Sequence, residues 1–216
     1  MAERLPLPPP RALLFDAMGT LIGLRTSVGH TYAELAADHG LSVSAAAIDQ
    51  AFPVVYRQAP PLAFPGLGGS ALEAAERTWW GERIDAVLMA AGAGPASAAL
   101  KHELFDRFAQ PDLWRPYPGV LEHLQRWSRA GLQLAVVSNF DSRLGALLEG
   151  LALAPWLQAV VISSAAGAAK PDPLPFQLAL EALDVPAAQT WHVGDSPEDG
   201  LGAQRAGLRW LRIVHP

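Results

Sequence analysis

Four short groups of residues carry the side chains with which this chain could do chemistry. They are residues 16–20 (DAMGT), 138–139 (SN), 170–173 (KPDP) and 194–199 (GDSPED). Together they offer carboxylates, a lysine and hydroxyl groups, and the backbone N–H groups near them can face an anion. Such a mixture suits a site that transfers a phosphoryl group.

Asp16 is the candidate nucleophile of this set. Asp16, Asp195 and Asp199 would bring several negative charges together, which is costly unless a cation lies among them. Their hard oxygen atoms suit magnesium. Lys170 could keep Asp16 ionised and offset the charge of a bound anion. Ser138 adds a hydroxyl that could hold a phosphate oxygen.

Each group alone also has an ordinary structural explanation. An aspartate or a Ser-Asn pair after a strand often closes a turn. Lys-Pro-Asp-Pro suits the start of a helix, and Gly-Asp-Ser suits a helix N-cap. Because all four groups occur in order beside successive strands, the functional interpretation is the stronger one.

Alternating strands and helices are predicted to position these groups. Five short apolar runs predict strands, at residues 11–15, 133–137, 159–162, 190–193 and 210–214. Helical patterns lie at residues 119–130, 142–151, 173–183 and 197–206. This order predicts an α/β fold with a Rossmann-like parallel sheet flanked by helices. Ligands bind at the carboxyl ends of such strands, so we expect the four groups to meet at one sheet edge.

A long insertion separates the first predicted strand from the rest. Helical patterns cover residues 28–56, with a break at Gly40, and continue at residues 72–91 and 96–109. No strand pattern appears between Ile22 and Arg115. We therefore expect two domains, an α/β core of residues 1–21 and 116–216 and an all-helical domain of residues 22–115.

Composition excludes several classes of partner and chemistry. Of the 216 residues 17% are charged, and the net charge is −5, so no nucleic acid or anionic membrane is expected as a partner. The absence of cysteine excludes disulfides, thiolate metal sites and a cysteine nucleophile. No signal-peptide pattern or apolar span is present, which fits a cytoplasmic protein. The Pro-rich start, through Pro10, predicts an extended tail.

The four groups, in this order, resemble the ordered motifs of the haloacid dehalogenase superfamily, and the match runs from Phe15 to Gly207. The resemblance implies that Asp16 is the nucleophile and the first metal ligand. Lys170 would steady the nucleophile and the phosphoryl charge. Asp195 would bind magnesium, and Asp199 would bind it directly or through water.

The resemblance also assigns the remaining positions. Ser138, Thr20 and Asn139 would bind the substrate, although Asn139 could instead only close its turn. The backbone carbonyl of Met18 would be a further metal ligand. The helical insertion would be a cap that closes over the site and selects a small phosphorylated metabolite. The whole chain is similar to the subfamily of haloacid dehalogenase-like hydrolase domain-containing protein three, through residues 29–33 (GHTYA), 79–80 (WW) and 138–141 (SNFD).

Met18 departs from the pattern of the superfamily's phosphatases. These enzymes carry a second aspartate here, which protonates the leaving group and then activates water, and methionine can do neither. Three functions follow as alternatives: a slow or cap-assisted magnesium-dependent phosphohydrolase, a 2-haloacid dehalogenase, or a module that only binds a phosphorylated ligand or a protein. Dehalogenases also lack the second aspartate, but they use no metal, and Gly194-Asp195-Ser196 favours the metal.

Four further residues receive structural predictions. Trp79 and Trp80 are adjacent on a predicted helix and point to different faces, so one should lie in a core and the other at a cleft or interface. Asp141 is expected to be the N-cap of the following helix. His192 lies within a strand and is expected to be packed rather than to bind a ligand.

Overall fold

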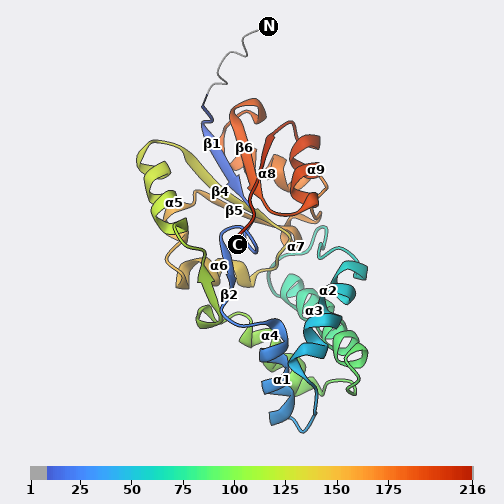
Figure 1. The fold of residues 1–216 in the computed structure, drawn as a ribbon. Coiled ribbons are helices and arrows are strands. Elements are labelled where there is room, and N and C mark those ends of the chain that lie inside the picture. The colour runs from blue at the N-terminus through green and yellow to red at the C-terminus, as the bar shows by residue number, and fades with distance from the viewer. Residues whose placement is uncertain (1–8, 216) are drawn as a thin grey trace, which may run out of the picture.

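A five-stranded parallel sheet forms the centre of the computed structural model, which describes residues 9–215 (Figure 1). The strands are β1 (Ala12–Phe15), β4 (Gln133–Ser138), β5 (Ala159–Ile162), β6 (Thr190–Gly194) and β7 (Arg209–Arg212). Their order is β5-β4-β1-β6-β7, and every neighbouring pair is parallel. The predicted Rossmann-like α/β fold is confirmed. Most of the predicted extended tail lies outside the described residues.

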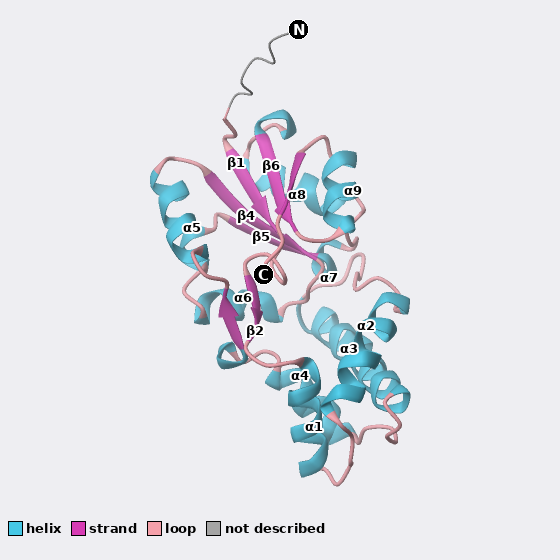
Figure 2. Ribbon diagram, viewed as in Figure 1, coloured by secondary structure: helices cyan, strands magenta, loops and turns pink. Residues whose placement is uncertain are grey.

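Helices cover both faces of the sheet (Figure 2). They are α5 (Val120–Arg129), α6 (Arg143–Gly150), α7 (Ser163–Ala166), α8 (Leu174–Leu183) and α9 (Pro197–Arg205), with short 3-10 turns at Pro111–Leu113, Ala154–Trp156 and Ala187–Gln189. Alternate residues of β1 point to opposite faces of the sheet. Leu13 and Phe15 pack with α5 and α6, whereas Ala12 and Leu14 pack with α8 and α9. Burial on both faces explains why the strand reads as a continuous apolar run.

The insertion folds into four helices with a hydrophobic core of its own. They are α1 (Val28–Asp38), α2 (Ala45–Gln58), α3 (Gly69–Ala90) and α4 (Ala98–Arg107). Side chains of Ser27, Ser44 and Ser97 accept the N-terminal hydrogen bonds of α1, α2 and α4, as helix N-caps do. Buried residues from all four helices form the core, among them Tyr32, Ile48, Ile84 and Leu100. Figure 1 shows this cap beyond the carboxyl ends of the strands.

Two short strands connect the cap to the sheet domain. β2 (Ile22–Leu24) pairs antiparallel with β3 (Trp114–Pro116). The prediction that no strand lies between Ile22 and Arg115 is therefore wrong. Each strand has only three residues, which is too short to show an alternating pattern, and its partner lies far away in the sequence. The exact domain boundaries stay a prediction.

A polar junction ties the cap to the loop after β4. The indole N–H of Trp80, on α3, donates to Asp141 Oδ2 at 2.6 Å. Glu76 Oε1, also on α3, accepts from the backbone N–H of Ser142 at 3.0 Å and from its hydroxyl at 2.8 Å. Arg143 donates to both oxygens of Asp141 and to the carbonyl of Phe105 on α4. These contacts fix the cap over the loop that begins directly after Ser138, the last residue of β4.

The junction settles the predictions for the paired tryptophans and Asp141. Trp79 is 6% exposed inside the cap, whereas Trp80 reaches the other domain, so the expected division of roles is confirmed. Ser142 directly precedes α6 but makes no side-chain capping hydrogen bond, whereas Asp141 Oδ1 accepts from the backbone N–H of Arg143 at 3.1 Å, which agrees with the predicted capping role of Asp141. The same carboxylate also binds the side chain of Arg143 and the indole of Trp80, and the sequence did not predict the contact with the distant tryptophan. Within residues 9–215, none of the helices has the length and apolar character needed to cross a membrane.

Candidate active site

The central position of β1 brings the four sequence groups together. β1 lies in the middle of the sheet, with β4 and β5 on one side and β6 and β7 on the other. The direction of strand addition therefore reverses at β1, and ligands bind at such a switch point. Asp16 follows β1, Ser138 ends β4, and Asp195 follows β6. Lys170 reaches the same place from the loop before α8.

Lys170 is the centre of the hydrogen-bond network. Its buried Nζ donates to Asp16 Oδ1 at 2.6 Å, to Asp199 Oδ1 at 2.6 Å and to the carbonyl of Val137 at 2.9 Å. The hydroxyl of Ser138 also donates to Asp16 Oδ1, at 3.0 Å. Both side-chain bonds to Asp16 within the described chain thus reach Oδ1, and neither engages Oδ2.

The ionisation of this network follows from its charges. Burial acts to lower the pKa of Lys170, but the charges and hydrogen bonds of Asp16 and Asp199 outweigh burial and raise it. Lys170 therefore stays protonated at neutral pH. Burial acts to raise the pKa of Asp199, but the hydrogen bond from His192 and the charge of Lys170 hold that pKa far below its usual range. The structure thus contains a buried, ionised Lys–Asp pair.

Asp199 anchors the network with both of its oxygens. Oδ1 also contacts His192 Nε2 at 2.8 Å, and Oδ2 accepts from the backbone N–H and the hydroxyl of Ser196 at 3.0 and 2.7 Å. Its side chain is fully buried. These bonds favour a positioning role for Asp199, with any metal contact made through water rather than directly.

His192 supports Asp199 from inside the sheet. It is fully buried and lies edge-on against Phe176, with ring centroids 4.9 Å apart, as expected for a packed residue. Burial lowers its pKa, so the imidazole is neutral and its Nε2–H donates to Asp199. Sequence analysis missed this support. The only signal was a polar residue at a position of β6 that faces the core.

Three carboxylates form a candidate cation site. Asp16, Asp195 and Asp199 each offer an oxygen, and these atoms lie within 4.8 Å of one another. Burial raises the pKa of Asp195, the charge of Asp16 raises it further, and no cationic side chain is among the groups that lower it, so two carboxylates face each other here without a cation between them. An oxygen-only donor set with unbalanced negative charge fits a magnesium ion.

The turn after β1 has to approach Asp195 closely. Gly19 has φ +87°, and a Cβ at this position would lie 2.7 Å from Asp195 Oδ2, so a residue other than glycine would clash. The hydroxyl of Thr20 donates to Asp195 Oδ1 at 3.3 Å. Thr20 therefore orients a candidate metal ligand in this structure, and its predicted contact with substrate stays a prediction.

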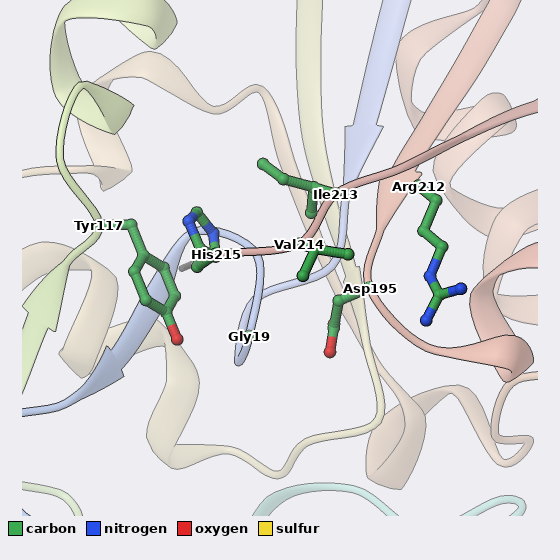
Figure 3. A pocket seen from close by; sticks show the side chains of 7 residues that line it. All are labelled: Gly19, Tyr117, Asp195, Arg212, Ile213, Val214 and His215. Carbon is green, nitrogen blue, oxygen red and sulfur yellow. The ribbon is translucent and has the colours of Figure 1, made fainter.

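A cavity of about 280 Å³ adjoins Asp195 and Gly19 (Figure 3). Tyr117 and residues 212–215 complete its wall. The ring of His215 stacks on Tyr117, with centroids 3.5 Å apart, and one of its nitrogens lies 3.0 Å from the carbonyl of Thr20. These contacts hold the segment after β7 against the turn that follows Asp16.

Asn139 and Met18 are the two residues whose surroundings differ most from the roles that the resemblance implies. Asn139 Nδ2 donates to the carbonyl of Lys170 at 3.0 Å, and Asn139 Oδ1 accepts from the N–H of Lys170 at 2.7 Å. Asn139 thus positions the lysine loop, and its predicted contact with substrate stays a prediction. The Met18 side chain is 45% exposed and offers no ionisable group. The predicted metal contact of its carbonyl stays a prediction.

Comparisons with known proteins agree with this architecture. A family model described as haloacid dehalogenase-like hydrolase matches residues 10–207. Haloacid dehalogenase-like hydrolase domain-containing protein 3 from Bos taurus is 38% identical over 220 residues, which cover 100% of this chain and 85% of that relative. A phosphoglycolate phosphatase from Caulobacter vibrioides is 36% identical over 126 residues, covering 55% of this chain and 53% of that protein.

Solved structures show the same fold. The crystal structure of a defluorinating L-2-haloacid dehalogenase has a TM-score of 0.76, with 22% identity over 96% of this chain and 82% of that chain. The family match covers both the sheet domain and the cap, and the relative from Bos taurus is similar over the whole chain. This protein belongs to the haloacid dehalogenase-like hydrolases.

Proposed function

We propose that this protein is a magnesium-dependent phosphohydrolase, in which Asp16 attacks the phosphorus of a small phosphorylated metabolite. The observation that carries the proposal is the surroundings of Asp16. One oxygen is held by Lys170 and Ser138, and a second carboxylate, Asp195, lies beside it with unbalanced negative charge. A cation is needed there for an anionic substrate to approach.

Attack by Asp16 Oδ2 would form an aspartyl-phosphate and break the bond from phosphorus to the leaving oxygen. The ammonium of Lys170 would offset charge on the phosphoryl oxygens, and the hydroxyl of Ser138 would donate to one of them. Magnesium, held by Asp16 and Asp195, would neutralise charge and orient the phosphoryl group. Water would then release phosphate from Asp16. With Met18 in place of an acid, substrates whose leaving group needs a proton should react slowly.

A 2-haloacid dehalogenase is the second candidate, because a halide ion leaves without a proton and so does not need an acid at Met18. The same carboxylate nucleophile would serve. However, a dehalogenase would work without a metal, and without a cation the charge at Asp195 would repel the carboxylate of a haloacid. The phosphohydrolase is therefore the better-supported candidate.

Phosphate release from p-nitrophenyl phosphate and from a panel of phosphorylated metabolites tests the proposal, with magnesium and with a chelator. We expect activity that needs magnesium and is abolished by Asp16→Asn. Met18→Asp should raise the rate on alkyl phosphates by about 10²–10⁴-fold, the usual contribution of a general acid and base.

Two outcomes contradict the proposal. If wild type and Met18→Asp both release no phosphate from any substrate, the protein is not a phosphohydrolase. Halide release from 2-haloacids without metal would then identify the dehalogenase. Inactivity in both assays, together with binding of a phosphorylated ligand, would leave a binding module.

A further inference from the structure

We propose that residues 213–215, the segment after β7, set the spacing between the two proposed metal ligands Asp16 and Asp195, with His215 as the positioning residue. The assignment rests on the proposed phosphohydrolase function, in which both carboxylates hold magnesium. It concerns a position that no motif marks, since the last of the four sequence groups ends at Asp199.

Two backbone carbonyls beside the proposed metal site accept hydrogen bonds from this segment. The N–H of Ile213 donates at 3.0 Å to the carbonyl of Gly194, the residue before Asp195. His215 Nε2 lies 3.0 Å from the carbonyl of Thr20, in the turn after β1. Because a carbonyl oxygen can only accept, Nε2 carries a proton and donates. One short segment thus joins the loop after β6 to the turn after β1 (Figure 3).

The ring of His215 packs on a side chain that is itself fixed. It stacks on Tyr117, with centroids 3.5 Å apart and an angle of 9° between the rings. The backbone N–H of Tyr117 donates to the carbonyl of Leu21 at 3.0 Å, and a Cβ at Gly23 would lie 2.7 Å from the tyrosine oxygen. Tyr117 is therefore held against the chain that leaves the turn. Stacking of this kind orders the imidazole before it donates to Thr20, so the hydrogen bond costs little further entropy.

Thr20 links the position of His215 to that of a metal ligand. Its side chain is buried, and its hydroxyl donates to Asp195 Oδ1 at 3.3 Å. The ligand oxygens of Asp16 and Asp195 lie within 4.8 Å of each other, whereas one magnesium ion can contact two oxygens that are at most about 4 Å apart. A small shift of the turn therefore decides whether both carboxylates reach the same ion. Removal of groups that orient metal ligands typically weakens metal binding by about 10–100-fold.

His215→Phe tests the assignment, because it keeps a ring to stack on Tyr117 and removes the donor to Thr20. We expect its dissociation constant for magnesium to rise by about 3–10-fold, as the loss of one neutral hydrogen bond predicts. His215→Gln can place an amide N–H near the same carbonyl and should recover most of the affinity. The constant is measured without substrate, from the rise of the urea unfolding midpoint with magnesium concentration, so it does not depend on turnover.

His123 supplies a matched control in the same domain. Its ring also contacts a backbone carbonyl, that of Gly119, and packs at a tilt against Trp127 with centroids 5.3 Å apart. These three residues are not among the described residues that line the cavity beside Asp195. His123→Phe therefore loses a comparable hydrogen bond away from the site, and it should bind magnesium as tightly as wild type.

Three results would overturn the assignment while an active wild type keeps the phosphohydrolase. In the first, His215→Phe is less stable than wild type in chelator but binds magnesium equally well, so that His215 only stabilises the fold. In the second, His123→Phe weakens magnesium binding as much as His215→Phe does. In the third, His215→Gln binds magnesium no better than His215→Phe.

Failure of the proposed function gives a different pattern. A wild type that binds magnesium but releases no phosphate would refute the phosphohydrolase, and a weaker magnesium affinity of His215→Phe would still support the role of His215. A wild type that binds no magnesium would refute both.

Discussion

Replacing Lys170 with methionine would test whether its buried ammonium balances the carboxylates of the candidate site. Lys170 Nζ lies 2.6 Å from an oxygen of Asp16 and 2.6 Å from an oxygen of Asp199, and its side chain is 3% exposed. Methionine keeps most of the volume and removes the charge. We expect a strong loss of stability that is separate from any loss of activity.

The size of the effect can be worked out from these contacts. At 2.6 Å and an effective dielectric constant of about 20, each ion pair attracts by roughly 6 kcal/mol, before the cost of removing the ions from water. That cost offsets much of the attraction while both partners are present. When one partner is deleted, the other stays buried without compensation, which typically costs about 3–5 kcal/mol. We therefore expect Lys170→Met to lower the free energy of unfolding by about 3–5 kcal/mol.

The pH dependence of this contribution has a defined sign. The pKa of Lys170 is raised in the folded protein above its value of 10.5 in a model compound. Its stabilising contribution is therefore complete below pH 10.5 and is lost only as the pH rises through the folded pKa. Between pH 7 and 9 the difference between wild type and Lys170→Met should be constant.

Urea unfolding of both proteins, in chelator so that no metal contributes, would measure the difference. Lys101→Met is the matched control, because Lys101 pairs with Asp85 in the cap with side chains 32% and 28% exposed. Such a partly solvated pair should contribute about 0–1 kcal/mol. If Lys170→Met costs no more than Lys101→Met, the buried lysine does not balance the site, and the reasoning is wrong.

Two other changes probe the acidic cluster and the domain junction. The raised pKa of Asp195 means that its ionised form destabilises the folded state, so Asp195→Asn should raise the free energy of unfolding in chelator at pH 7, by no more than about 1 kcal/mol because solvent screens a partly exposed carboxylate. This advantage should shrink as the pH falls through that pKa; a loss of stability at pH 7 would contradict the assignment of unbalanced charge. Trp80→Phe should cost about 1–2 kcal/mol more in urea unfolding than Trp79→Phe, because the first loses a hydrogen bond to a carboxylate and the second only one to a backbone carbonyl. Equal costs would show that the bond to Asp141 does not stabilise the closed cap.

The central strands of the sheet could be predicted because β1 and β4 are buried almost throughout and therefore appear as apolar runs. The first predicted strand, at residues 11–15, is observed as Ala12–Phe15, and the third, at residues 159–162, agrees completely. The last strand was predicted at residues 210–214 but is observed at Arg209–Arg212. β7 lies at the edge of the sheet and is more exposed, so its apolar pattern is weaker and its ends are harder to place.

Contacts between distant segments were the part that local patterns could not reveal. Nothing near Asp141 indicates that a tryptophan 61 residues earlier donates to it. The pairing of β2 with β3 also depends on the fold of the entire cap between them. By contrast, His192 and Asp199 are only seven residues apart, yet their contact depends on the turn from β6 into α9. Side-chain roles of this kind require the geometry.

The two carboxylates of the last motif illustrate this limit. Asp195 and Asp199 lie four positions apart, and the sequence predicts that both act at the metal, Asp199 either directly or through water. In the structure their pKa values move in opposite directions. Lys170 and His192 satisfy Asp199, whereas Asp195 accepts a long hydrogen bond from Thr20 and faces the charge of Asp16. A cation is therefore expected beside Asp195 and Asp16, the proposed nucleophile. The lysine organises one side of the cluster, and a cation on the other side would make the site attractive to a phosphate.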